Sequence, residues 1–321
     1  MFYSPAKTTV GKVTAALVLV VSLAYGCRGS SAQPPTITIS GAFALYPMVV
    51  RWSEEYRALH PEVQFDIQAG GAGKGMSDVL AGAVDIGMVS REIRAEETEQ
   101  GAVGIAVAKD AVVATMNADN PVLEQLLATG LTPEAGAGIW LTGDITTWGA
   151  LVGSGDTNVI HVFTRADSCG AAEVWAKYLG GEAQEDLLGT GVQGDPGVAE
   201  AVRQDPLGIG YNNLNFAYDS KTGQPIEGLL VIPLDLNGDG TISADEDFYD
   251  TREEVAQAIA EGRYPSPPSR ALFLVTKGKP DGIIADFIRW VLTDGQAFVE
   301  ETGYVRLTDA QLQEGLQLVG E

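Results

Sequence analysis

The stretch "IAVAKDAVVATMN", Ile105 to Asn117, is apolar along most of its length, with Lys109 and Asp110 near its centre. Such a run predicts one long extended segment of the kind that can cross between two lobes. Short β-branched runs and stretches of helical periodicity alternate on both sides of it. This alternation indicates an α/β architecture.

The alternation divides the chain into two blocks. The first contains the predicted strands 36–40, 63–69 and 84–90 and the predicted helices 45–60 and 75–83. The second begins near Asn120, and after the proline-rich loop "YPSPPSR" (264–270) the strand 271–277 and the helix 281–303 return to the first block. We therefore predict a two-lobed α/β fold with a ligand cleft between the lobes. Lobe 1 would comprise 36–112 and 270–321, and lobe 2 would comprise 113–269.

Composition limits the classes of partner. The 321 residues include 43 acidic and 20 basic side chains, for a formal charge of −23. Nucleic acid and anionic membrane surfaces repel such a protein, so neither is expected as a partner. Two cysteines, Cys27 and Cys169, provide no disulfide framework.

The N-terminal segment has the pattern of an export signal. Lys7 and Lys12 precede the apolar run 13–26, which is too short for a stable membrane span. We predict a signal peptide over 1–26, lipid attachment at Cys27 and a flexible tether over 27–35. The alternative is an ordinary secretory signal, because Leu23 lies four residues before the cysteine and not three.

Three predicted strand-to-helix turns share one design. They are "SGAFALYP" (40–47), "AGGAGKGM" (69–76) and "TRADSCGAAE" (164–173). The first turn of a helix offers free N–H groups and partial positive charge, so each turn is a candidate anion site. Lys74, Arg91 and Arg165 lie in or near these turns, and the planar fork of arginine matches an oxyanion bidentately. The second turn is neither a Walker A loop nor a dinucleotide-binding loop.

At this point the chain resembles a known family, the phosphate-binding proteins of ABC importers, which have the type II periplasmic-binding-protein fold. The resemblance rests on the segments 37–56, 84–93, 139–151, 163–175, 208–213 and 287–307. It implies a receptor that captures phosphate or a related tetrahedral oxyanion. It also implies delivery to an ABC permease and its ATPase, and no enzymatic activity.

The resemblance also implies a set of contact residues. Arg165 matches the arginine that holds the anion, and Asp167 matches an acidic position that orients it. The remaining positions implied to contact the anion are Ala42, Phe43, Ala44, Gly73, Lys74, Ser90, Arg91, Cys169, Gly170 and Ala171.

This chain departs from the family in the side chains of its turns. The family has hydroxyls in all three turns. Here those places hold Ala42 and Phe43 in the first turn, Ala72 with Lys74 in the second, and Cys169 and Ala171 in the third. A lost donor to a buried charge costs about 1.5–3 kcal/mol, so the identity of the oxyanion stays open. A carboxylate that accepts a ligand proton would favour hydrogen phosphate over sulfate. The candidates for that role are Asp167, Glu92 and Glu173.

Cys169 also permits an enzymatic alternative. A cysteine at a helix start is a possible nucleophile, and a hydrolase or phosphatase on the same scaffold would use it. The two histidines provide little support as bases. His60 is expected in solvent at a helix end, and His161 is expected to pack in a strand or bond to backbone.

The stretch "DLNGDGTISADE", 235–246, has the spacing of an EF-hand calcium loop. The predicted ligands are Asp235, Asn237, Asp239, the Thr241 carbonyl and Glu246. A strand precedes the loop and a helix is expected through "EDFYDTREEVAQ" (246–257), so the loop lacks the paired helices of a sensor. We expect structural Ca²⁺. The sequence thus predicts an exported, monomeric, lipid-anchored receptor at the periplasm or cell surface, with a calcium-dependent surface protein as a further alternative.

Overall fold

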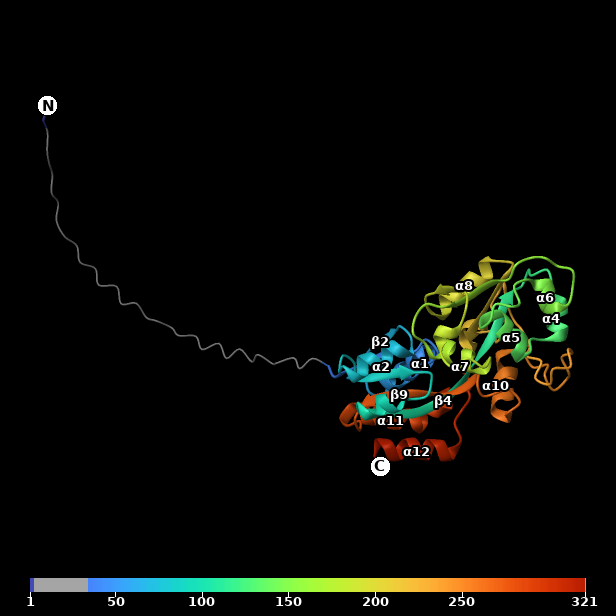
Figure 1. Cartoon of the computed structure of the whole chain (residues 1–321). Coiled ribbons are helices and arrows are strands. Elements are labelled where there is room, and N and C mark those ends of the chain that lie inside the picture. Colours follow the sequence, from blue (N-terminus) through green and yellow to red (C-terminus); the bar gives the residue numbers. More distant parts are fainter. Residues whose placement is uncertain (3–33, 321) are drawn as a thin grey trace. The chain divides into compact units, whose positions relative to one another are not determined.

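The computed structural model describes residues 1–2 and 34–320, and residues 34–321 form one compact unit. The predicted leader and Cys27 lie outside the described residues, apart from Met1 and Phe2. Within the unit, helices and strands alternate along the chain (Figure 1). The strands are β1 (Thr36–Gly41), β2 (Gln64–Ala69), β3 (Ile86–Val89), β4 (Ala102–Asn117), β5 (His161–Arg165), β6 (Thr190–Val192), β7 (Gly208–Asn213), β8 (Leu229–Val231) and β9 (Ser269–Lys277).

The described helices differ widely in length. The α-helices are α1 (Tyr46–Leu59), α2 (Ala72–Leu80), α3 (Ala95–Glu99), α4 (Leu123–Thr129), α5 (Pro133–Trp140), α6 (Trp148–Val152), α7 (Gly170–Tyr178), α8 (Gly194–Gln204), α9 (Leu214–Ala217), α10 (Arg252–Glu261), α11 (Gly282–Leu292) and α12 (Asp309–Val319). Two 3₁₀ turns, η1 (Gln184–Asp186) and η2 (Asp294–Phe298), complete the set. No helix among the described residues is long and apolar enough to span a membrane.

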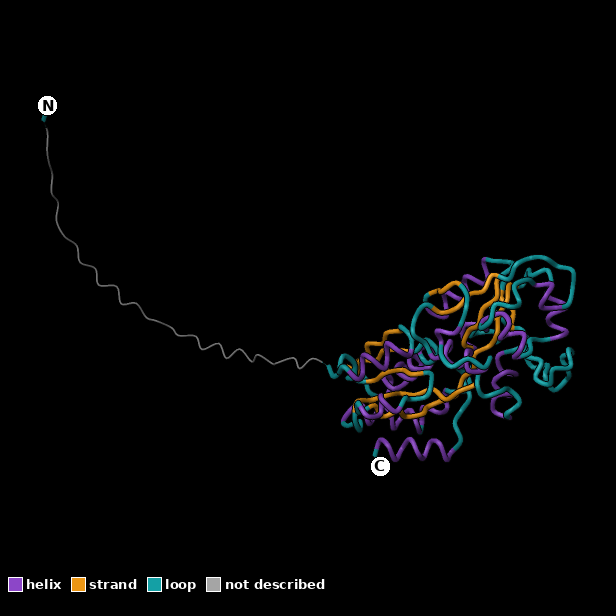
Figure 2. The backbone as a smooth tube through the Cα atoms, in the orientation of Figure 1, coloured by secondary structure: helices purple, strands orange, loops and turns teal. Residues whose placement is uncertain are grey.

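The sheet is organised around β4, the predicted crossing segment. The strand order is β2-β1-β3-β9-β4-β7-β5-β6, and β8 also pairs with β4. The first part of β4 pairs with β9 over 102–111, and its last part pairs with β7 over 112–116. One continuous strand therefore belongs to both halves of the sheet, as Figure 2 shows. The predicted α/β type II fold is confirmed.

Two hydrophobic cores lie on either side of this crossing. One contains buried side chains from 37–108 and 272–319, and we call this part the first lobe. The other contains those from 111–264 together with Val305, and we call it the second lobe. The two cores meet along β4 between Ala108 and Ala111, where Asp110 lies.

Three predicted helices begin or end elsewhere. The helix expected over 75–83 runs from Ala72 to Leu80. The helix expected from residue 246 starts at Arg252, because Thr251 caps it. The Thr251 hydroxyl accepts from the Glu254 N–H (3.2 Å), and the Glu254 carboxylate accepts from the Thr251 N–H (3.1 Å). The helix expected over 281–303 ends at Leu292 and continues as η2.

A buried ion pair lies where β4 and β9 cross between the lobes. Asp110 and Arg270 are cross-strand partners, and their side chains approach to 3.6 Å. The second Asp110 oxygen accepts from the Ala111 N–H (2.6 Å). Burial raises the pKa of Asp110 to about 7 against the opposing effect of Arg270, and burial lowers the pKa of Arg270. Ionisation of Asp110 therefore costs free energy in the folded protein.

This pair predicts a pH dependence of stability that Asp110→Asn removes. A carboxyl with a raised folded pKa binds more protons folded than unfolded, so its contribution to stability falls as pH rises from about 4 to about 7. A shift from 3.8 to about 7 limits this loss to about 4 kcal/mol. Urea unfolding at pH 5 and pH 8 gives the free energy of unfolding, which should fall more between these pH values in the wild type than in Asp110→Asn. Parallel declines in the two proteins would contradict the raised pKa.

Candidate functional site

The three predicted turns meet between the two lobes. The Gly73 N–H of the first lobe donates to the Ser168 carbonyl of the second lobe (3.1 Å). Gly71 has φ +90°, and a Cβ placed there would lie 2.6 Å from the same carbonyl oxygen. Gly170 approaches the Ser90 carbonyl so closely that a Cβ would overlap it. Glycine is required at these contacts because the two backbones approach directly.

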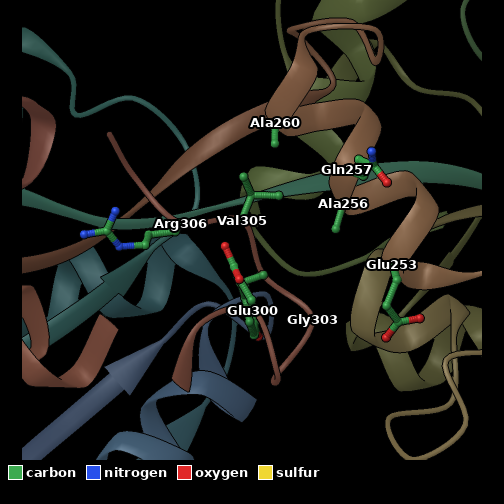
Figure 3. Close-up of a pocket in the computed structure, with 9 residues that line it drawn as sticks. Glu253, Ala256, Gln257, Ala260, Glu300, Gly303, Val305 and Arg306 are labelled. Atoms are coloured by element: carbon green, nitrogen blue, oxygen red, sulfur yellow. The ribbon is translucent and has the colours of Figure 1, made fainter. Parts of the chain in front are cut away.

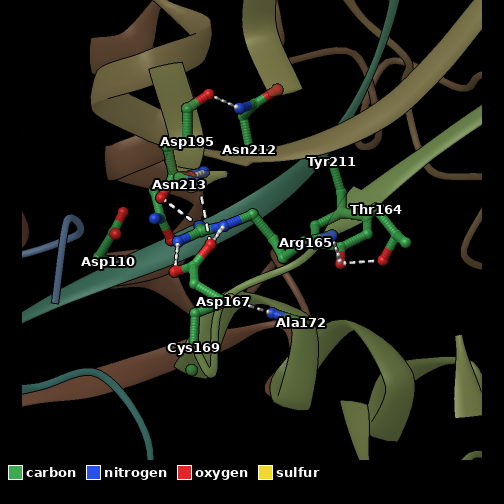
Figure 4. A network of polar contacts seen from close by, with 12 residues as sticks. Asp110, Thr164, Arg165, Asp167, Cys169, Ala172, Asp195, Tyr211, Asn212 and Asn213 are labelled. Atoms are coloured by element: carbon green, nitrogen blue, oxygen red, sulfur yellow. Dashed lines mark hydrogen bonds and ion pairs between the residues drawn. The ribbon is translucent and has the colours of Figure 1, made fainter. Parts of the chain in front are cut away.

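Arg165, at the end of β5, is the centre of the polar network in Figure 4. Its side chain is 1% exposed. Nε donates to Asp167 Oδ1 (2.8 Å) and Nη2 donates to Asp167 Oδ2 (2.5 Å), while Nη1 donates to Asp195 Oδ2 (2.5 Å). Two buried aspartate side chains thus flank one guanidinium.

The network favours the charged forms of Arg165 and Asp167. Burial acts to lower the pKa of Arg165, but the charges of Asp195 and Asp167 raise it above its ordinary value. Burial acts to raise the pKa of Asp167, but Arg165 and the Gly194 N–H (2.9 Å) hold it below the usual range. The arginine and its orienting aspartate are therefore both charged at neutral pH.

The site retains donors for an anion. Guanidinium has five N–H groups, and three of them donate to carboxylates, which leaves one on each terminal nitrogen. Among the described residues, the N–H groups of Phe43, Ala44, Gly170 and Ala171 donate to no protein acceptor. These amides belong to the turns at the start of α1 and α7, where the helix dipole favours negative charge.

Phe43 carries an aromatic ring from the first turn across to the second lobe. The ring centre lies 5.4 Å from Arg165 Cζ. It also makes an edge contact with Phe216 of α9, at 6.3 Å between ring centroids. The family resemblance implied a contact at this position, and the structure places a ring beside the arginine.

Lys74 and Arg91 form ion pairs away from Arg165. The Lys74 ammonium pairs with Asp78 one helical turn later, and its side chain is 41% exposed. Arg91 binds Glu97 through two hydrogen bonds of 2.9 and 2.6 Å. Neither cation is brought into the network of Figure 4, although both are close to the turns in sequence.

Two of the three candidate proton acceptors are already engaged. The Asp167 oxygens accept from Arg165 and Gly194. The Glu173 oxygens accept from Lys177 and Arg94, both at 2.8 Å. Glu92 is exposed.

Cys169 is a helix cap, and its thiol is not activated. Its Sγ accepts from the Ala172 N–H (3.4 Å), as the serine of a helix cap does. Burial raises the pKa of the thiol to about 12, against the opposing charge of Arg165. His161 Nδ1 lies 2.6 Å from Asp205 Oδ2, so the expectation that it packs or bonds to backbone was wrong. The buried environment of Cys169 therefore provides no thiolate nucleophile at neutral pH.

Asp195 and Gln184 belong to the site but were not predicted. Asp195 opens α8 and is fully buried, and its Oδ1 accepts from the Asn213 N–H (3.1 Å). The Gln184 amide donates to the Asp167 carbonyl (2.8 Å) and accepts from the Cys169 N–H (2.9 Å). The sequence signal that could have found Asp195 is an acidic residue directly before Pro196, a pattern typical of a helix start.

The loop 235–246 has two buried carboxylates at its ends. Asp235 accepts from the N–H groups of Gly238 (2.7 Å) and Gly240 (2.9 Å). Glu246 accepts from the N–H groups of Leu236 (2.9 Å) and Ser243 (3.1 Å). Among the described residues, no group of three or more His, Cys, Asp or Glu side chains is arranged to hold a metal ion.

Figure 3 shows a cavity elsewhere in the molecule, of about 330 Å³. It lies between α10 and the segment 300–306, and none of its lining residues belongs to the three turns. Tyr304, which lines it, donates its hydroxyl to the Ala44 carbonyl (2.6 Å). The back of this cavity therefore contacts the first turn, but the cavity itself is separate from the Arg165 network.

Comparison with known proteins gives a consistent result. The model of the PBP superfamily domain matches residues 28–295. The chain is 26% identical over 298 residues to the phosphate-binding protein PstS of Bacillus subtilis, covering 89% of this chain and 85% of that protein. It is also 26% identical over 367 residues to PstS of Methanocaldococcus jannaschii, covering 94% and 92%.

Solved structures show the same fold. A putative phosphate ABC transporter substrate-binding protein with bound phosphate from Clostridium perfringens superposes with a TM-score of 0.68 at 23% identity, covering 85% of this chain and all of that one. An ABC-type phosphate transport receptor from Vibrio cholerae superposes with a TM-score of 0.60 at 22% identity, covering 84% of this chain and all of that one.

The buried network predicts a large effect of Asp195→Ala on stability. Removing one carboxylate leaves the Arg165 Nη1 group without its acceptor, and breaking a buried pair costs about 3–5 kcal/mol. Asp286→Ala is the control, because Asp286 pairs with Arg289 at the surface and its side chain is 63% exposed; the expected loss there is below about 1 kcal/mol. Urea unfolding measures both. Equal losses would show that Asp195 is not required for the fold.

Proposed function

Because the chain belongs to the PBP superfamily, we propose that it is a receptor that captures phosphate or a related tetrahedral oxyanion between its two lobes. The anion would rest on the first-lobe turns and on the start of α7, with Arg165 beside it. The receptor would then deliver the anion to a membrane permease of the ABC type. The PstS relatives and the phosphate-bound structure support this choice of ligand.

One observation carries the proposal. Within residues 34–320, backbone amides from both lobes donate to no protein acceptor at the place where the turns meet, and two N–H groups of Arg165 are likewise left over there. An anion that accepts from Phe43 and Ala44 on one side and from Gly170 and Ala171 on the other would hold the lobes together. Binding energy would thus favour the closed arrangement.

The charge of the molecule opposes this capture. The sequence carries a formal charge of −23, and Arg165 is itself flanked by two carboxylates. The attraction must come from oriented amides and helix dipoles at short range, where low dielectric strengthens them. Asp167 and Glu173 already accept from protein donors, so we expect only weak discrimination between hydrogen phosphate and sulfate.

Export and lipid attachment at Cys27 are part of the proposal. They rest on the N-terminal sequence, in which basic residues precede an apolar run and a cysteine follows it. A receptor of this kind acts outside the cytoplasm, and a lipid anchor would keep it beside its permease. If Cys27 carries the lipid, a labelled fatty acid should be incorporated into the wild type and not into Cys27→Ser.

Structural Ca²⁺ in the loop 235–246 is also proposed. The donors fit in chemistry, since Asp235 and Glu246 are buried carboxylates at the loop ends and Asn237 and Asp239 supply further oxygens. Bound calcium would take the carboxylate oxygens that now accept from the loop's own N–H groups. Its role would be to hold a twelve-residue loop of the second lobe in one conformation.

The identity of the anion can be tested by titration. Isothermal titration of the purified protein, stripped of bound anion and kept in calcium, with phosphate, arsenate, sulfate and molybdate should give one site per chain. Phosphate and arsenate should bind alike, and sulfate should bind within roughly tenfold of phosphate, which corresponds to about 1.4 kcal/mol.

Two results have clear meanings. Exclusion of sulfate by much more than tenfold would show that a carboxylate in the cleft accepts the ligand proton after all. Absence of binding by all four anions at moderate salt would overturn the proposed function.

Calcium binding can be tested through thermal stability. A ligand that binds only the folded state at 100 times its Kd stabilises that state by about 2.7 kcal/mol, which is a rise in Tm of about 5 °C for a chain of this size. Differential scanning fluorimetry should show this rise in the wild type and lose it in Glu246→Gln. Glu261→Gln, at an exposed carboxylate on α10, is the matched control. Equal rises in all three proteins would place the calcium elsewhere.

A further inference from the structure

The Phe43 ring forms a wall on one side of the Arg165 guanidinium. Its centre lies 5.4 Å from Arg165 Cζ, within the range of a cation–π contact. The ring comes from the first lobe, whereas the arginine belongs to the second. It therefore approaches the arginine from the opposite lobe.

Two contacts hold the ring in this position. Phe216 packs against it edge to face, with an interplanar angle of 81°. Gly194 faces the tip of the ring, and a Cβ placed there would lie 2.9 Å from Phe43 Cζ. Gly194 also has φ +72° and donates its N–H to Asp167. Gly194 therefore has two roles: its N–H holds Asp167, and its missing side chain leaves room for the Phe43 ring.

The main chain and the side chain of Phe43 have different relations to an anion. The Phe43 N–H has no acceptor among the described residues, so it remains a donor. The ring offers no hydrogen bond and fills space beside the guanidinium. A compact anion with oxygens in every direction can use the donors, but an anion with an organic substituent needs room for it.

We propose that the Phe43 ring determines the ligand class of this cleft by admitting free tetrahedral oxyanions and excluding organic phosphates and phosphonates. The proposal rests on the proposed function, since it concerns the same anion. The ring acts by volume, and its contact with Arg165 keeps it in place. A phosphonate that carries a ring of its own would need the space between Phe216 and Gly194.

The test compares inorganic phosphate with phenylphosphonate by isothermal titration of the full chain. In the wild type, phosphate should bind and phenylphosphonate should not compete. In Phe43→Ala, the phenyl group can take the vacated space. The Kd of phenylphosphonate divided by the Kd of phosphate should therefore fall by roughly tenfold or more. Phe43→Leu keeps most of the volume and should keep most of the discrimination. Phe65→Ala, at a half-buried ring of β2 in the first lobe, is the control with an unchanged ratio.

The outcomes separate this proposal from the proposed function. An unchanged ratio in Phe43→Ala overturns the role of the ring while phosphate binding stands. Failure of the wild type to bind either anion, with phenylphosphonate bound by Phe43→Ala, overturns the proposed function and supports only the exclusion of organic phosphonates by the ring. Failure of both proteins with both anions overturns both proposals.

Discussion

The guanidinium of Arg165 is buried between two carboxylates, and the rest of the site depends on that arrangement. Asp167 is two residues away on the same turn, but Asp195 comes from the start of α8. Asp195 in turn accepts from Asn213 at the end of β7. Asn213 accepts from Arg270 of β9, which pairs with Asp110 at the crossing strand. A chain of polar contacts therefore links the candidate anion site to the junction of the two lobes (Figure 4).

If the proposed function holds, this arrangement accounts for an anion site whose turns lack several hydroxyls of the family. The charge of Arg165 is offset by the protein's own aspartates, so the arginine contributes shape and two N–H groups more than net charge. The remaining donors are backbone amides at helix starts, which do not depend on the side chains at Ala44 or Ala171. A count of lost hydroxyl groups thus overstates the loss of binding energy, because dipoles fixed by the fold remain.

Much of the architecture was readable from the sequence, because it follows from periodicity over long segments. The run 105–117 predicted β4, and the three glycine-rich or helix-opening turns predicted the place where the lobes meet. Partners distant in sequence were not readable. Asp195 is thirty residues from Arg165, and only the fold brings them together. Lys74 is a different case, since Asp78 lies four residues later on the same helix and the pair could have been recognised as an i,i+4 contact.

Phe43 shows why resemblance at a position does not transfer a role with it. The position was implied as a contact because it matches the first contact loop of the family. Here the N–H can still donate, while the side chain contacts the other lobe. The two functions separate because the main chain conformation of the turn sets the direction of the N–H, and the side chain is free to vary. A ring in this place restricts the volume beside Arg165 without removing a backbone donor. Selectivity for the size of the anion can therefore change while the mode of binding is retained.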